Sequence, residues 1–265
     1  MIMIQMQKKL KLKKAKTNFK TGAHCFGFFL FILFSVSTCK QDQELTGRSI
    51  VEQSVTKHGG LSNWDSITAL SFDKTTLLFD KYGKVESSTT QQQLFKFQPV
   101  LQGQIVSFYK GLEGLYYNGK EFRKRMNDSI YTVIDSTELA SARNSFYAAN
   151  YVVSQPFKLL DEGTVLSYIG IETLDNKQVY VVDVSYSGST DTSDKWTYYF
   201  DVKNYQLVAN KVIHNANVSL IKNLKFDSTS GFLFNAHRKS FTLKSSGEID
   251  YLRAEYFYEN FKVKQ

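Results

Sequence analysis

The sequence predicts a mainly β protein with one domain, an open half-barrel of about ten or eleven antiparallel strands. Short runs of alternating apolar and polar residues fill most of the chain after residue 70, and this period of two is that of strands with one buried face. Aromatic residues, which favour strands, make up 15% of the chain. Only two prolines and no Gly/Ser-rich linker interrupt it, so no domain boundary is indicated. Because a twisted sheet of this size must bury its apolar face, we expect it to curl around its own aromatic side chains.

An N-terminal helix is expected to plug the concave side of this sheet. Ser49 and Glu52 match a capping box for a helix over residues 49–58, and Gly59-Gly60 supplies its C-terminal stop. A helical turn over 62–67 follows, with Ser62 and Asp65 in the same capping relation.

A first strand meander and a central helical insertion come next. Asp135 and Glu138 form a capping pair for a helix over 137–150, and a short helix or turn follows at 156–160. The central helices are expected to cover the same concave side. The strands predicted before this insertion run over 70–80, 84–97, 104–110, 113–118 and 121–134.

The C-terminal half is nearly all strand, and its alternation assigns side chains to faces. In residues 178–186 one face holds Tyr180, Val182, Val184 and Tyr186, and the other holds Asp183 and Ser185. The alternation in the later strands likewise places aromatic and aliphatic side chains on one face. This face either lines a ligand cavity or forms a packed barrel core. The candidate cavity residues are Tyr180, Val182, Val184, Trp196, Tyr198, Phe200, Leu224, Phe226, Tyr256 and Tyr258.

The N-terminus reads as a lipoprotein signal peptide. Seven lysines precede an apolar run over residues 25–36, which is shorter than the roughly 20 residues that span a bilayer. Val36-Ser37-Thr38-Cys39 then resembles a bacterial lipobox. We therefore expect a signal peptide over 1–38, a palmitate-type acyl anchor on Cys39, a tether over 39–46 and the folded domain over 47–265. The alternative is ordinary secretion, with a free thiol at Cys39.

Charge excludes a nucleic-acid partner once the signal is removed. The whole chain carries a net charge of +8, but the seven lysines lie before Cys39, where no acidic residue occurs. The remaining 26 Lys and Arg face 25 Asp and Glu, a net charge of +1. The expected place is the cell envelope, anchored to the outer membrane and facing the periplasm. Lys40, Asp42 and Glu44 leave display on the cell surface as an alternative.

No catalytic or metal-binding pattern stands out. The GxSxG nucleophile motif is absent, and His214 and His237 lack the spacing of metal ligands. His58 falls in the last helical turn, where its charged form would meet the helix dipole, so a structural role is favoured over that of a general base. We expect no cofactor, no metal and no enzymatic activity, with an envelope hydrolase as the weakest alternative.

The order of elements resembles the LolA/LolB lipoprotein carriers, the LppX-type lipid carriers and the sensor domain of RseB. His58-Gly59-Gly60 followed by Trp64 is also similar to the start of a group of uncharacterised envelope lipoproteins. The resemblance covers residues 46–263. It implies a concave apolar cavity that holds a lipid or a lipoprotein acyl chain. We expect the protein to be a monomer. Gly231-Phe232-Leu233-Phe234 is the one candidate for a membrane-engaging loop like that of LolB. The alternative is a sensor or scaffold that engages an envelope protein partner, with the barrel interior fully packed.

Overall fold

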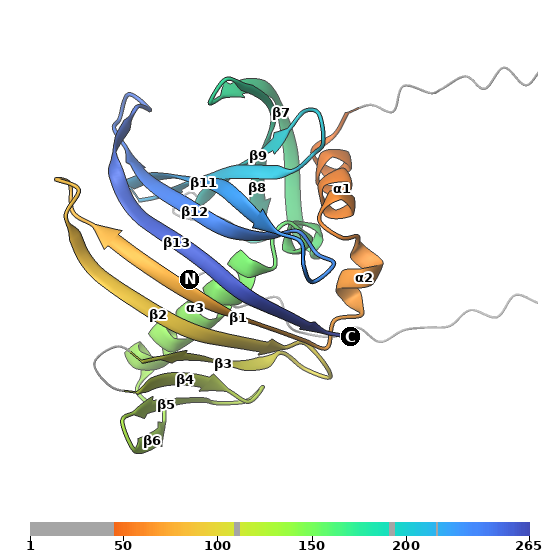
Figure 1. The fold of residues 1–265 in the computed structure, drawn as a ribbon. Helices are drawn as coiled ribbons and strands as arrows, with labels where there is room; N and C mark the ends of the chain where they lie inside the picture. The colour runs from red at the N-terminus through yellow and green to blue at the C-terminus, as the bar shows by residue number, and fades with distance from the viewer. Residues whose placement is uncertain (1–44, 109–111, 191–193, 216) are drawn as a thin grey trace, which may run out of the picture.

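A computed structural model of the chain describes residues 45–108, 112–190, 194–215 and 217–265. They form a single thirteen-stranded antiparallel sheet, in the order β6-β5-β4-β3-β2-β1-β13-β12-β11-β10-β9-β8-β7 (Figure 1). The first six strands are β1 (Ala69–Phe79), β2 (Val85–Lys96), β3 (Gln102–Ser107), β4 (Glu113–Tyr117), β5 (Phe122–Met126) and β6 (Ser129–Thr132). The other seven are β7 (Thr164–Leu174), β8 (Lys177–Tyr186), β9 (Lys195–Asp201), β10 (Leu207–His214), β11 (Asn217–Asp227), β12 (Phe234–Leu243) and β13 (Ile249–Lys264).

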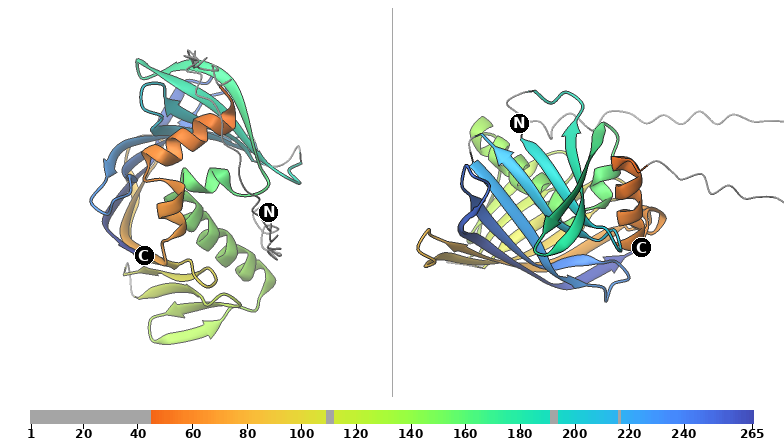
Figure 2. Two further views of the ribbon diagram at one scale, coloured as in Figure 1. Left: turned by 90° about the vertical axis from the view of Figure 1, so that its right-hand side faces the viewer. Right: turned by 90° about the horizontal axis from the view of Figure 1, so that it is seen from above.

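The sheet contains two meanders, β1 to β6 and β7 to β13. They are joined by the pairing of β1 with β13, the first and the last strand in the sequence. It curls around a concave side, and its edge strands β6 and β7 do not pair with each other (Figure 2). The predicted open half-barrel is confirmed, with thirteen strands where ten or eleven were expected. One extra strand arises because residues 121–134 split into β5 and β6 at Asn127, whose φ of 52° suits asparagine in a tight turn.

Helix α1 (Gly47–Lys57) begins earlier than predicted. Its N-cap is Thr46: the Ser49 N–H donates to the Thr46 hydroxyl oxygen at 3.1 Å, and the Thr46 N–H donates to the Ser49 hydroxyl oxygen at 2.9 Å. Ser49 is therefore the third helical residue of a capping box, and its predicted pairing with Glu52 was wrong. Glu52 instead forms an exposed ion pair with Arg48.

The other helical segments complete the concave side. Helix α2 (Leu61–Asp65) starts after Gly60 without a side-chain cap, so the predicted capping by Ser62 was wrong. Helix α3 (Ser136–Val153) begins at Asp135, whose carboxylate accepts a 2.8 Å hydrogen bond from the Glu138 N–H, as predicted. A 3₁₀ turn, η1 (Phe157–Leu160), follows it. None of the helices in the described ranges is long and apolar enough to cross a membrane.

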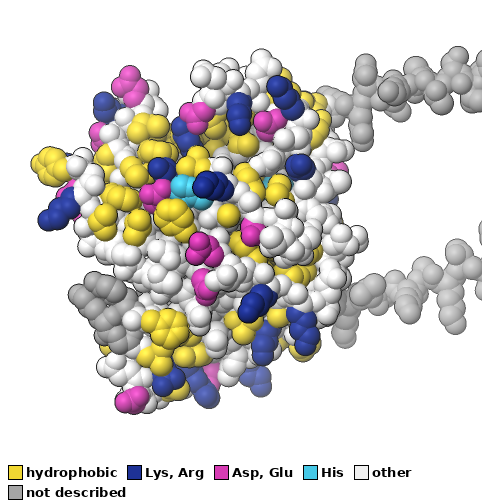
Figure 3. Space-filling view, viewed as in Figure 1, with side chains coloured by type: hydrophobic (Ala, Val, Ile, Leu, Met, Phe, Trp, Pro, Cys, Tyr) yellow, Lys and Arg dark blue, Asp and Glu magenta, His cyan; other side chains and the backbone are white. Residues whose placement is uncertain are grey.

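One hydrophobic core joins the helices to the inner face of the sheet. Phe146 of α3 is fully buried, and its ring centroid lies 5.3 Å from those of Phe95 and Tyr117. Trp64 of α2 stacks on Phe157 of η1 at 4.3 Å. On the face shown in Figure 3, hydrophobic and charged side chains are interspersed over the strands. The helices are thus fixed to the concave side by aromatic packing.

Candidate functional site

The ten residues predicted to line a cavity occupy three different environments. Val182, Val184, Tyr198, Phe200 and Tyr258 are buried members of the core. Another set is only half-buried: Tyr180, Trp196, Phe226 and Tyr256. Leu224 is 46% exposed, next to an irregularity in the pairing of β11 with β12. The most deeply placed residues therefore pack against other side chains, and the half-buried aromatic residues are the ones within reach of a ligand.

A cluster of tyrosine hydroxyl groups connects α3 to strands β8 and β9. The Tyr198 hydroxyl lies 3.1 Å from that of Tyr151 and accepts a 2.9 Å hydrogen bond from the Gln155 amide. Tyr151 also hydrogen-bonds Tyr186. Burial raises the pKa of Tyr151, Tyr186 and Tyr198 well above that of free tyrosine, so all three stay protonated. The cluster supplies neutral hydroxyl groups and no base.

A buried arginine lies beside this cluster on the same face. Arg238 is 4% exposed; its Nε donates to Asn223 Oδ1 at 2.8 Å, and its Nη2 donates to Asn210 Oδ1 at 2.9 Å. Asn210 pairs across the strands with Tyr198, and Arg238 pairs with Tyr256. The side chains on this part of the concave face are therefore Tyr198, Asn210, Asn223, Arg238 and Tyr256, which we call the concave polar cluster.

A second cation borders the concave polar cluster. Lys74 pairs across the strands with Tyr258, and its Nζ lies 5.2 Å from the centroid of the Tyr256 ring and 5.8 Å from that of Tyr258. Burial raises the pKa of Tyr256, so its hydroxyl is protonated as well. The cluster combines two cationic side chains with amide and phenol groups, a set that can bind an anion but cannot act as a general base at neutral pH.

The sequence reading did not single out Arg238, Lys74, Asn210 or Asn223. They have the same strand parity as the apolar residues of the concave face, so a signal was available: each is a polar residue at an inward position. That signal was missed because only the apolar members of the alternating runs were assigned to the candidate cavity.

His58 has the structural role that was predicted, for a different reason. It is fully buried, with Nδ1 donating to the Leu233 carbonyl at 2.7 Å and Nε2 accepting from the Leu207 N–H at 3.3 Å. Burial, with a smaller contribution from Lys57, lowers the pKa of His58 to about 4, although the bond to Leu233 opposes this. The ring is thus neutral, and the expectation of a charged form at the helix dipole was wrong.

The loop before β12 is not an exposed membrane-engaging segment. Phe232 and Phe234 are 3% and 1% exposed, and Phe234 stacks on Phe261 at 4.6 Å. Gly59 makes this packing possible, because a Cβ at that position would lie only 2.7 Å from the Phe232 ring. The His-Gly-Gly motif therefore ends α1 and seats this loop in the core.

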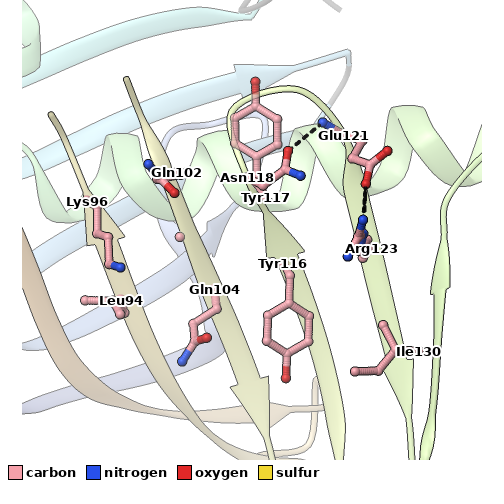
Figure 4. A pocket seen from close by; sticks show the side chains of 11 residues that line it. Leu94, Lys96, Gln102, Gln104, Tyr116, Tyr117, Asn118, Glu121, Arg123 and Ile130 are labelled. Carbon is pink, nitrogen blue, oxygen red and sulfur yellow. Dashed lines mark hydrogen bonds and ion pairs between the residues drawn. The ribbon is translucent and has the colours of Figure 1, made fainter. Parts of the chain in front are cut away.

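Two hollows lie on the convex side instead, with volumes of about 320 Å³ and 440 Å³. The cross-strand row that lines them runs from Ser71 through Leu94 and Gln104 to Tyr116, opposite in parity to the buried Phe95. Figure 4 shows the first hollow, where Glu121 forms an ion pair with Arg123. Both are open and polar at their margins, without the apolar enclosure typical of a lipid site.

Neither of the remaining histidines belongs to a metal site in the described ranges. His214 pairs with Asp194 at 2.6 Å, and His237 pairs with Glu255 at 2.6 Å. No group of three or more potential ligands occurs among the residues that the structure covers.

Solved structures with the same fold come from bacteria. A LolA superfamily protein from Nitrosomonas europaea matches with a TM-score of 0.54 and 12% identity, covering 83% of this chain and 94% of its own. A DUF1329 family protein from Desulfovibrio piger has a TM-score of 0.54 at 11% identity, with 82% and 92% covered. A lipoprotein-sorting domain, described as a putative outer membrane protein of Vibrio parahaemolyticus, has a TM-score of 0.50 at 8% identity, again with 82% and 92% covered.

These likenesses confirm the predicted LolA-type fold. No curated protein matches the chain. The model of a family of unknown function, DUF6503, matches residues 23–260. The chain is therefore a member of the DUF6503 family, built on the LolA-type half-barrel.

Proposed function

We propose that this protein is a lipid-anchored envelope protein that binds a hydrophobic molecule, a lipid or a lipoprotein acyl chain, on the concave side of its half-barrel. The binding is non-catalytic, and the protein acts as a monomer. The LolA-type fold supports the class of function, and the side chains of the concave face support the place.

One observation carries the proposal: an apolar row on the concave face that the helices leave half-buried. It consists of two neighbouring parts on this face, beside the concave polar cluster. Trp196 pairs across the strands with Val212. Ile221 lies diagonally from Val212, two residues from its partner Ser219, and its own ladder continues through Ser240 to Ala254 and Leu78. Its apolar members are Trp196, Val212, Ile221, Ala254 and Leu78, of which only Ala254 is fully buried. An acyl chain laid along the row would gain about 25 cal/mol for each Å² of apolar surface removed from water.

Removing the largest side chain of this row is the direct test. Trp196→Ala is expected to weaken binding of a fluorescent fatty acid by about tenfold, because the indole is the row's largest apolar surface. Lys195→Ala, at the adjacent and exposed position on the opposite face, is the matched control and should bind as the wild type does. Equal losses in the two variants would contradict the assignment of the ligand to the concave face.

The anchor belongs to the same proposal, although Cys39 lies outside the described residues. Cys39→Ala is expected to abolish incorporation of labelled palmitate and to shift the protein from the membrane fraction to the soluble envelope fraction. Unchanged labelling would contradict acylation at Cys39. Protease treatment of intact cells separates the two orientations, since only a surface-displayed chain would be cleaved.

A second candidate, a scaffold for an envelope protein, is favoured by the edge strand β7. Val165, Ile169 and Ile171 are 50%, 57% and 51% exposed along it. An edge strand with exposed aliphatic side chains can pair with a strand of a partner. Under this alternative, Ile169→Lys would abolish co-purification of the partner, and neither the wild type nor the variant would bind lipid. Under the carrier proposal, Trp196→Ala is the variant that impairs function.

A further inference from the structure

Two cationic side chains face the concave interior without an acidic partner. Arg238 is paired only with the neutral amides of Asn210 and Asn223. Lys74 lies over the rings of Tyr256 and Tyr258. No carboxylate in the described part of the chain forms an ion pair with either cation.

The neighbouring acidic residues are directed to the other face or are already neutralised. Asp73 and Glu259 pair with each other across the strands and have the opposite parity to Lys74 and Tyr258. Glu255, adjacent to Tyr256, pairs with His237 and Lys239. From α3 and the turn after it, Tyr151 and Gln155 present neutral groups to this region through Tyr198. Among the residues that the structure covers, no carboxylate therefore neutralises the positive charge of Arg238 and Lys74 through an ion pair.

An unpaired buried guanidinium costs folding free energy, because amide oxygens replace only part of its hydration. Substituting a neutral residue of similar volume is often neutral or stabilising in such a place. Asn210 and Asn223, themselves 2% and 7% exposed, hold two nitrogen atoms of the guanidinium, and Asn223 is fixed in turn by its 2.9 Å bond to the Leu207 carbonyl. Nη1 makes no hydrogen bond with any residue in the described ranges, so the guanidinium retains donors for a further acceptor.

We propose that Arg238, with Lys74 beside it, binds the acidic head group, a carboxylate or a phosphate, of the hydrophobic ligand. The head group approaches past the half-buried Tyr256, and the apolar part lies along the row that begins at Trp196. Arginine and lysine both bind carboxylates and phosphates through charge-assisted hydrogen bonds. This inference rests on the proposed function and narrows its ligand to acidic amphiphiles.

The test compares ligands that differ only in head-group charge. The full chain carrying Cys39→Ala, which removes the protein's own acyl chains, is delipidated and titrated with oleate, methyl oleate and oleoyl lysophosphatidate. We expect the wild-type site to bind oleate at least about tenfold more tightly than methyl oleate. The lysophosphatidate arm separates the two head groups, since the tighter of the two acids identifies the natural class.

Variants then assign the charge to Arg238. Arg238→Met should remove the preference for oleate while methyl oleate binds as before, and Arg238→Lys should retain part of it. Arg123→Met is the control, because Arg123 pairs with Glu121 at the hollow on the convex side. Thermal unfolding checks that each variant is folded, and Arg238→Met is expected to unfold at a temperature no lower than that of the wild type.

The outcomes distinguish this inference from the proposed function. Equal affinity for oleate and methyl oleate, or full oleate binding by Arg238→Met, would overturn the acidic head group and leave a carrier of neutral lipids. Binding of none of the three ligands would overturn the proposed function itself.

Discussion

Acidification from about pH 7.5 to about pH 4.5 is expected to lower the free energy of unfolding by roughly 2 to 3 kcal/mol through His58 alone. Burial lowers its pKa in the folded state to about 4, from 6.5 for the free side chain. Between these values the unfolded chain binds a proton that the folded chain does not, so stability rises with pH across the window. The contribution of His58 is complete above about pH 6.5 and is lost as the pH falls toward 4.

Urea unfolding at the two pH values measures this effect, and His58→Gln is the matched control. Glutamine keeps a donor and an acceptor but does not titrate near pH 6, so the variant should lose most of the pH dependence of stability above pH 4.5. It should also be less stable than the wild type, because it does not reproduce the packing of the buried ring. Hydrogen bonds from Lys124 and Tyr131 lower the pKa of Glu138 from 4.5. The stability that Glu138 contributes is therefore lost mostly below pH 4.5, outside the range in which His58 acts. A variant with an unchanged slope between pH 6.5 and 4.5 would refute the assignment to His58.

Phe146→Ala is expected to destabilise the protein by about 3 to 5 kcal/mol. The side chain is fully buried and contacts rings on β2, β4 and β5, including Phe122 at a centroid distance of 5.8 Å. Its loss would leave a cavity between α3 and the sheet that neighbouring aromatic rings cannot fill without changing rotamers. Chemical denaturation monitored by tryptophan fluorescence reads the change directly.

Tyr82→Ala is the control for this substitution. Tyr82 lies at the hairpin tip between β1 and β2 and is 82% exposed, so its removal should change stability by no more than about 0.5 kcal/mol. If Phe146→Ala were as mild, α3 would contribute little to stability, and its place as a fixed plug on the concave side would be contradicted.

The sequence predicted the architecture well because its local patterns and its topology agree. Alternation in segments such as Tyr180 to Tyr186 survives in the structure as one inward and one outward face, and the Asp135 cap starts α3 where it was expected. Caps were harder to place near the N-terminus. Ser49 serves as the third residue of a capping box as readily as the cap itself, and only the backbone conformation at Thr46 distinguishes the two.

The candidate site was predicted only in part. Alternation along a strand specifies neither how far the helices cover the inward face nor which residues pair between strands. The inward aromatic residues follow from parity, but whether they are packed or accessible depends on how far the helices cover them. The alternation predicts that the convex face is polar and exposed to solvent. Val179, Val181 and Tyr199 are nevertheless buried there in a small second cluster. Arg238 and its asparagine partners come from three strands, so their contact follows from pairing registers that periodicity does not specify.

The two faces of the sheet differ in how their charged side chains are paired. On the convex side, Glu121, Glu86 and Glu255 each pair with a basic side chain. On the concave side, Arg238 is hydrogen-bonded to Asn210 and Asn223, and Lys74 lies over two tyrosine rings. Neither cation forms an ion pair with a residue that the structure describes. A buried cation without an acidic partner costs folding free energy. A site that binds an acidic amphiphile would use such a cation, whereas a core that serves packing alone would not.

Native mass spectrometry with lipid extraction tests the central claim most directly. The full chain with Cys39→Ala, expressed in the envelope and purified gently, is expected to carry a bound lipid at a defined stoichiometry, and the extract would identify its class. A ligand-free mass that stays unchanged after incubation with fatty acids, phospholipids and lipopeptides would contradict a carrier, and would favour a scaffold that engages a protein through β7.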